Sequence, residues 1–132
     1  MILPDTSAWI EYLRGSGQPS HLSLQEAVTA GQDIGTIDVV MMELLAGAPN
    51  DERYQRISRL LARFEFVGTR TPWDYVAAAD LYRRCRAAGV TIRKMNDCLI
   101  ATVAIRTGAE LLHQDRDFEA IAQHSALKIY VA

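Results

Sequence analysis

The sequence predicts an α/β protein built as a three-layer α/β/α sandwich around a short, mainly parallel sheet. Short apolar runs alternate with segments of helical periodicity along the whole chain, which is the order that parallel crossovers require. Four or five short strands fit the length of 132 residues, and that length can bury one continuous core. We therefore expect residues 1–132 to form a single domain.

The first half of the chain holds four helical segments between short strands. Asp5 follows an apolar run, and Thr6 and Ser7 are good N-cap residues for the amphipathic stretch after them. Gly31 ends the second helical segment, and Asp38 is placed to cap the third. We expect strands at residues 1–3 and 34–37 and helices at 7–14, 20–30, 39–46 and 51–64.

The second half of the chain alternates in the same way. Thr71, Pro72 and Asp74 make a helix start, with a hydroxyl cap, a proline in the first turn and an acid three residues after the cap. Residues 98–105 are almost wholly apolar, so their helix must be central and buried. We expect strands at residues 66–67, 110–113 and 127–131 and helices at 71–89, 94–107 and 118–124.

Composition restricts the class of protein. Apolar residues make up 49% of the chain and charged residues 23%, which is ordinary globular usage. No apolar run approaches the length of a membrane span, and an acid at position 5 interrupts any signal-peptide pattern, so we expect a cytoplasmic protein without a membrane partner. Cys85 and Cys98 lie in helical patterns without nearby ligand residues and are interpreted as reduced, packed thiols.

The net charge of −2 argues against a general, sequence-blind nucleic-acid coat. It does not exclude an RNA partner. Without the five acids discussed below, the chain has 14 basic and 11 acidic side chains, and a bound metal ion would hide those five acids from a phosphate backbone.

Two acidic segments follow predicted strands. Asp5 comes after the first apolar run, and Asp115 and Asp117 come after the run at residues 111–113. Ligands of open parallel sheets bind outside the carboxyl ends of the strands, so both segments are expected at one cleft. Taken singly, Asp5 is equally well a turn residue beside a helix dipole, and residues 115–117 are better explained as a solvated turn.

Two further acids lie in apolar surroundings. Glu43 is enclosed by the apolar segment 39–45, so it faces a cleft at the edge of the core or lies on a narrow solvent stripe. Asp97 stands at the amino end of the central apolar helix, which directs it to a site. One shared pocket explains the four segments better than four independent solvated positions. Clustered carboxylates take up protons or a cation, and hard oxygen ligands suit Mg²⁺ or Mn²⁺.

Four motifs, in their order and spacing, resemble those of the PIN-domain nucleases and, more narrowly, of the VapC toxins of type II toxin–antitoxin systems. They are Asp5-Thr6-Ser7, Met41-Met42-Glu43-Leu44-Leu45-Ala46-Gly47, Asn96-Asp97-Cys98-Leu99-Ile100-Ala101 and Leu112-His113-Gln114-Asp115-Arg116-Asp117-Phe118. The resemblance covers essentially the whole chain. It implies that Asp5, Glu43, Asp97 and Asp115 are the family's acidic quartet and that Asp117 is a frequent additional acid.

The resemblance also implies an activity and partners. The expected protein is a Mg²⁺- or Mn²⁺-dependent endoribonuclease that inhibits translation and growth, forms a homodimer, and is inhibited by a cognate VapB-type antitoxin. One or two ions, held mainly by Asp5 and Asp97 with support from Asp115 and Asp117, would orient and acidify a water for attack on phosphorus. Glu43 would ligate through water or position the nucleophile.

Polar neighbours of these acids have two interpretations each. Thr6 and Ser7 are candidate donors to the Asp5 carboxylate and are equally candidate helix caps. His113 is a weaker candidate for an acid or base, because a histidine at a strand end is often only a satisfied polar residue.

Basic residues near the acids are candidate RNA contacts. Arg93 and Lys94 lie just ahead of Asp97, and Arg116 lies between two of the acids. Arg116 is also suited to balancing the charge of its neighbours or binding an antitoxin carboxylate. The more distant Arg83, Arg84 and Arg86 are better explained as a solvated helix end.

Other functional classes fit less well. A non-catalytic RNA- or protein-binding module of the same fold would have an incomplete acid set, and a nuclease of RNA processing would share the site without an antitoxin. A phosphatase of the haloacid-dehalogenase type requires a second acid two residues after the first aspartate, where Ser7 stands.

The first helix is unusually apolar for its length. Trp9, Ile10, Tyr12 and Leu13 crowd it, so they either pack the core or form an exposed surface on which an antitoxin docks. The sequence gives both interpretations equal weight.

Overall fold

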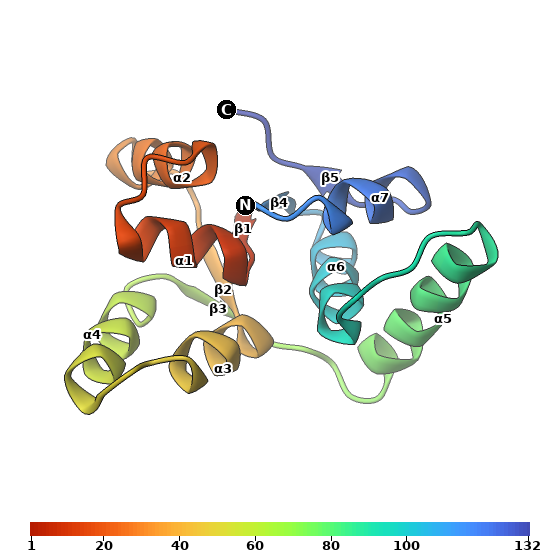
Figure 1. Ribbon diagram of the computed structural model, residues 1–132, viewed down its shortest axis with the longest axis horizontal. Coiled ribbons are helices and arrows are strands. Elements are labelled where there is room, and N and C mark those ends of the chain that lie inside the picture. The colour runs from red at the N-terminus through yellow and green to blue at the C-terminus, as the bar shows by residue number, and fades with distance from the viewer.

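Short parallel strands form the centre of the computed structural model, which describes residues 1–132 (Figure 1). One sheet has the order β1-β4-β5, and a second pairs β2 with β3. A parallel bridge between Ile2 and Ile34 joins the two sheets, so the strands follow the order β3-β2-β1-β4-β5. The strands are β1 (Ile2–Pro4), β2 (Gly35–Ile37), β3 (Glu65–Val67), β4 (Glu110–Leu112) and β5 (Lys128–Ile129). The predicted short parallel sheet is confirmed.

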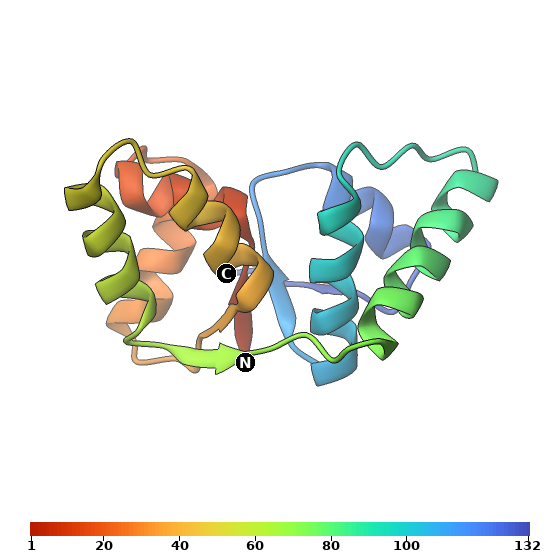
Figure 2. The same cartoon turned by 90° about the horizontal axis from the view of Figure 1, so that it is seen from below.

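Helices cover both faces of the strands, as the sequence predicts (Figures 1 and 2). The helices of the first half of the chain lie on one side, and those of the second half lie on the other. The first group is α1 (Thr6–Arg14), α2 (Pro19–Thr29), α3 (Asp38–Ala46) and α4 (Asp51–Leu61). The second group is α5 (Trp73–Ala87), α6 (Met95–Thr107) and α7 (Asp117–Gln123). None of these helices has the length and apolar content that a membrane crossing requires.

The strand order reverses between β1 and β4. From β1 the chain proceeds to β2 and β3 on one side, and β4 and β5 are added on the other side. The backbone N–H of Asp5 donates to the carbonyl of Leu112 at 2.9 Å, which holds the carboxyl ends of β1 and β4 together. Side chains that follow these two strands therefore meet at the place where open parallel sheets bind ligands.

Helix α6 is the buried centre of the second half. Every residue from Asp97 to Ala104 is buried, which confirms the position expected for this apolar helix. The core of the first half contains Trp9, which is fully buried against Tyr12 and Phe64, with ring centroids 5.7 Å and 5.3 Å away. Trp9 is therefore a core residue, and of the two interpretations given equal weight for the first helix, the exposed docking surface is wrong for Trp9.

Two predicted helix caps do not form in the expected way. Asp38 is the first residue of α3 and not its N-cap; its Oδ1 accepts the backbone N–H of Val39 at 2.8 Å, and its Oδ2 accepts the backbone N–H and the hydroxyl of Thr69 at 3.0 Å and 2.9 Å. Thr71 does not cap α5, and Asp74 takes no part in a capping box. Asp74 instead accepts the backbone N–H of Arg70, ahead of the helix, at 2.8 Å and binds the guanidinium of Arg106 through charge-assisted hydrogen bonds.

Candidate active site

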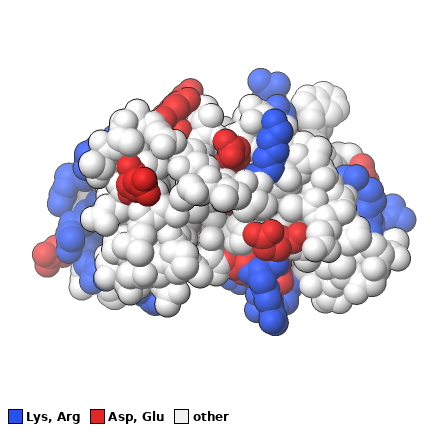
Figure 3. All heavy atoms as spheres, turned by 90° about the horizontal axis from the view of Figure 1, so that it is seen from above, with Lys and Arg blue, Asp and Glu red and all other residues white.

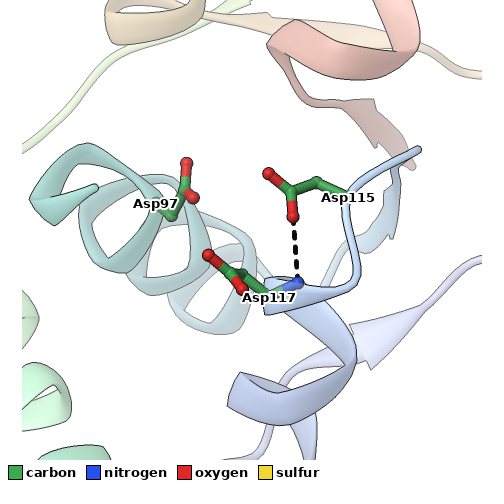
Figure 4. A group of neighbouring side chains, drawn as sticks. All are labelled: Asp97, Asp115 and Asp117. Atoms are coloured by element: carbon green, nitrogen blue, oxygen red, sulfur yellow. Dashed lines mark hydrogen bonds between the residues drawn. The ribbon is translucent and has the colours of Figure 1, made fainter. Parts of the chain in front are cut away.

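Three carboxylates from α6 and from the segment after β4 point toward one another (Figure 4). Asp97 lies in the first turn of α6, Asp115 lies in the loop, and Asp117 begins α7. One oxygen from each lies within 4.8 Å of the others. The loop fixes two of them, because the backbone N–H of Asp117 donates to Oδ1 of Asp115 at 3.0 Å. We call these three residues the carboxylate trio.

Asp97 is the most unusual member of the carboxylate trio. It is only 5% exposed, and its Oδ2 is buried without any hydrogen-bond partner. Burial raises the pKa of Asp97 from 3.8 to about 7, and the nearby charges of Asp115 and Asp5 add to the rise. A buried, unpaired carboxylate oxygen costs stability unless a cation or a proton reaches it.

Asp5 is equally buried but well supplied with donors. Its Oδ1 accepts the backbone N–H of Ala8 at 2.9 Å and the hydroxyl of Ser7 at 2.7 Å. Asp5 is thus the N-cap of α1, and the cap role expected for Thr6 or Ser7 is wrong. Burial still outweighs these hydrogen bonds and raises the pKa of Asp5 to about 6. Asp5 lies outside the carboxylate trio, although its charge acts on Asp97.

Glu43 projects from α3 toward the start of α1. Its Oε1 accepts the hydroxyl of Thr6 at 2.6 Å. The expectation that Thr6 donates to Asp5 is therefore wrong, and the two hydroxyls divide between the two acids. Glu43 also lies outside the carboxylate trio, but its charge contributes to the raised pKa of Asp97.

The loop that carries Asp115 is held by hydrogen bonds on several sides. Nδ1 of His113 accepts the backbone N–H of Asp115 at 3.1 Å, so the neutral ring carries its proton on Nε2, which lies 3.1 Å from Glu119. Both ring nitrogens are occupied, which favours the structural interpretation of His113. Gln114 donates its backbone N–H to Ser7 and accepts the backbone N–H of Ser20 on its side chain, at 2.9 Å and 3.0 Å.

Sequence reasoning missed Gln114 because nothing local marks it. Its side-chain partner Ser20 lies 94 residues away, at the start of α2, where the helix has no cap of its own. Only the folded topology brings the two together.

The basic residues named from the sequence lie around the trio in different ways. Arg93 binds Asp115 and Asp117, both at 3.0 Å. Lys94 is exposed, and its positive charge partly opposes the rise in the pKa of Asp97. Arg116 is exposed and forms no ion pair. Basic and acidic atoms lie side by side on one face of the molecule (Figure 3).

Comparison with known proteins identifies the family. The family model described as PIN domain matches residues 2–123, most of the chain. The chain belongs to the PIN-domain family. This PIN domain is 39% identical to the VapC ribonuclease Mb1587 of Mycobacterium bovis and to the ribonuclease VapC11 of Mycobacterium tuberculosis. Each match covers 97% of the chain and 96% of the relative, which places the chain in the VapC group.

A solved structure confirms the fold. The PIN domain aligns with a chain of VapBC2 from Rickettsia felis, crystallised with a DNA fragment from its promoter, with a TM-score of 0.77 and 20% identity. The alignment covers 98% of both chains. The family match over residues 2–123 and the relatives that are 39% identical confirm the family resemblance drawn from the four motifs.

The residues of this PIN domain fit a divalent cation. The carboxylate trio offers three hard oxygen ligands, and the buried oxygen of Asp97 is one that no protein donor satisfies. Carboxylate ligands of this kind suit Mg²⁺, Mn²⁺ or Ca²⁺ and are poor for soft metals.

Proposed function

We propose that residues 1–132 act as a single domain and that this PIN domain is a Mg²⁺- or Mn²⁺-dependent endoribonuclease, the toxin of a type II toxin–antitoxin pair. The observation that carries the proposal is Asp97, a buried acid that faces Asp115 and Asp117 and whose Oδ2 has no hydrogen-bond partner. The ribonuclease names of the relatives that are 39% identical support the same activity.

The five acids have different parts in the proposed reaction. The carboxylate trio would hold one or two metal ions. Asp5 would supply a further oxygen at the edge of this metal site. A bound ion of this kind polarises a phosphodiester and lowers the pKa of an attacking water. Ser7 orients the Asp5 carboxylate. Thr6 holds one oxygen of Glu43, which leaves the other to position a water and accept its proton.

The RNA would lie across the exposed cations beside the trio. Lys94 and Arg116 are exposed and free of ion pairs, so they can approach phosphates without losing a partner. Contacts of this kind are independent of base sequence, so the identity of the cleaved RNA is set elsewhere on the surface.

An antitoxin would dock on α1 and α4. Ile10 and Leu13 line a groove together with Leu44, Ala48 and Ile57, and Glu43 is also among its lining residues. An amphipathic segment that covers such a groove brings its end to the site. With Trp9 in the core, the proposed docking residues of the first helix reduce to Ile10, Tyr12 and Leu13.

We also propose a two-fold homodimer, the commonest oligomer symmetry. Support comes from large apolar side chains exposed near the junction of β3 and α5. Phe66, Trp73 and Val76 are 63%, 70% and 57% exposed. Sedimentation of the purified protein would measure the dimer directly.

The test of activity uses protein freed of any antitoxin. Wild-type protein should cleave a structured RNA in Mg²⁺ or Mn²⁺ and should stop when EDTA is added. Cleavage that persists under chelation contradicts the metal mechanism. Binding without cleavage would favour the non-catalytic module instead. For the toxin role, expression should arrest growth, and co-expression of a small neighbouring antitoxin gene should restore it.

A further inference from the structure

Arg93 joins two members of the carboxylate trio. Its Nη2 lies 3.0 Å from Oδ1 of Asp115, and its Nε lies 3.0 Å from Oδ2 of Asp117. The acids are nearly buried, with side chains 17% and 13% exposed, whereas the Arg93 side chain is 58% exposed. A largely solvated cation therefore neutralises two acids that have little solvent of their own.

Arg93 does not satisfy the third acid. It makes no hydrogen bond to Asp97, whose buried Oδ2 stays without a partner. Arg93 is the only cation that forms an ion pair with the carboxylate trio, so Asp115 and Asp117 share one positive charge and Asp97 has no ion-pair partner. The arginine and a divalent ion would compete for the carboxylates of Asp115 and Asp117, but only an ion small enough to sit among all three acids would also reach Asp97.

We propose that Arg93 is an exchangeable counter-ion of the site. It holds Asp115 and Asp117 together when no metal is bound, releases them to a divalent cation, and then binds a phosphate of the RNA. This inference rests on the proposed function. An exposed ion pair contributes little free energy, whereas a divalent ion is the largest local charge in such a site, so the exchange favours the metal.

The position of Arg93 in the chain suits this exchange. Its neighbour Ile92 is 4% exposed and anchors the loop between α5 and α6 in the core. The backbone of Arg93 therefore stays at the rim while its side chain moves. The open pocket at this rim is lined by Arg93, His113, Gln114, Asp115 and Arg116 and has no hydrophobic side chain. A guanidinium released there can bind one phosphate through two N–H donors, with the same Nε and Nη2 that now bind one carboxylate each.

Arg93→Gln separates this role from simple support of the loop. Binding of Mn²⁺ to the metal-free protein is titrated calorimetrically, and RNA cleavage is measured at saturating Mn²⁺. We expect Mn²⁺ to bind about five- to tenfold more tightly to the variant, because the competing cation is gone. The KM for RNA should rise by about tenfold with little change in kcat, because a phosphate contact is lost.

Arg116→Gln is the matched control for metal binding. It removes the same charge from the same rim, but Arg116 forms no ion pair with the acids. Long-range electrostatics should therefore tighten Mn²⁺ binding by at most about twofold. Arg93→Lys keeps the charge but not the planar fork, so its Mn²⁺ affinity should lie between those of wild type and Arg93→Gln.

Several outcomes would overturn the inference. Equal tightening in Arg93→Gln and Arg116→Gln would mean a general charge effect, and weaker Mn²⁺ binding in Arg93→Gln would mean that Arg93 only supports the loop. Tighter Mn²⁺ binding with an unchanged KM would contradict the phosphate contact. Failure of the wild-type protein to bind Mn²⁺ at all is a different result, because it contradicts the proposed function itself.

Discussion

The two ends of helix α6 handle a buried aspartate in opposite ways. At its amino end, Asp97 has a buried oxygen without a partner, and burial raises its pKa to about 7. At its carboxyl end, Arg106 binds Asp74, which is 2% exposed, at 2.9 Å to 3.1 Å. Burial also acts to raise the pKa of Asp74, but the hydrogen bonds from Arg106 and Arg70 and the charge of Arg106 outweigh it, so the pKa is lowered.

The difference separates an acid whose oxygens are satisfied within the chain from one that has a buried oxygen without a partner. Arg106 also donates to the carbonyl of Gly68 at 2.9 Å, so it ties α6 to the loop before α5. Asp74 and Arg106 complete each other within the chain. Asp97 forms no such ion pair, so its buried carboxylate lowers the free energy of unfolding. Buried acids of this kind are common at functional sites.

The largest predicted effect is the loss of cleavage in Asp97→Asn. The amide keeps the volume of the side chain but removes the charge that would hold a divalent ion, so kcat/KM should fall by about a thousandfold. Because a buried, unpaired charge is removed, the metal-free variant should melt no lower than the wild type. Circular dichroism and RNA cleavage measure the two properties. A variant that still cleaves at the wild-type rate would remove Asp97 from the site.

Asp74→Asn should show the converse pattern. It leaves Arg106 without its anion, and since the Arg106 side chain is 24% exposed, the loss of stability should be about 2 kcal/mol, below the cost for a fully buried pair. Urea unfolding measures this loss. Cleavage per folded molecule should stay close to wild type. A stable Asp74→Asn protein with impaired cleavage would contradict the proposal that Asp74 contributes to stability and not to cleavage.

The pH dependence of stability should also separate the two ends. The raised pKa values of Asp5 and Asp97 mean that the folded state retains protons that the unfolded state releases above 3.8. The metal-free protein should therefore lose stability as pH rises from about 4 to about 7, by several degrees in Tm. The lowered pKa of Asp74 gives the opposite sign, with stability lost only as pH falls below 3.8.

Melting curves in EDTA between pH 5 and pH 8 isolate the site acids, because Asp74 stays ionised throughout that range. Asp97→Asn should flatten the fall in Tm. An equal fall in the variant and the wild type would show that other groups cause it.

A smaller effect is expected from Ser7→Ala. Ser7 donates to both oxygens of Asp5, at 2.7 Å and 2.9 Å, so its loss should reduce metal affinity or cleavage by about tenfold. Thr102→Val is the control, because the Thr102 hydroxyl bonds only to the carbonyl of Cys98 inside α6. If both variants behave alike, Ser7 acts through packing and not through the Asp5 carboxylate.

Local patterns in the sequence predict most of the fold. Alternating strands and helices, the buried helix α6 and the place of Asp5 after the first strand all follow from periodicity and from the rules for parallel sheets. Asp97, Asp115 and Asp117 meet as part of the expected shared cleft, whereas Asp5 and Glu43 lie outside the group of three.

Long-range polar pairs could not be predicted in the same way. In the sequence, Arg106 has the position of a cation at a helix end, and Asp74 has the position of an acid in a capping box. Neither local pattern indicates that the two side chains bind each other across 32 residues. The ion pairs of Arg93 with Asp115 and Asp117 span more than 20 residues, so the place of Arg93 ahead of Asp97 does not reveal them. The aromatic contact of Trp9 is also long-range. Phe64, which follows the end of α4 at Leu61, packs against Trp9 in the core.

The most direct test is the effect of Mn²⁺ on melting temperature at pH 8 in wild type, Asp97→Asn and Asp74→Asn. At Mn²⁺ about a hundredfold above Kd, wild-type Tm should rise by about 10 °C. Asp74→Asn should show the same rise from a lower starting Tm, and Asp97→Asn should show almost none. An equal rise in Tm in all three proteins, or no rise in the wild type, would contradict the claim that Asp97, at the amino end of α6, binds the metal ion.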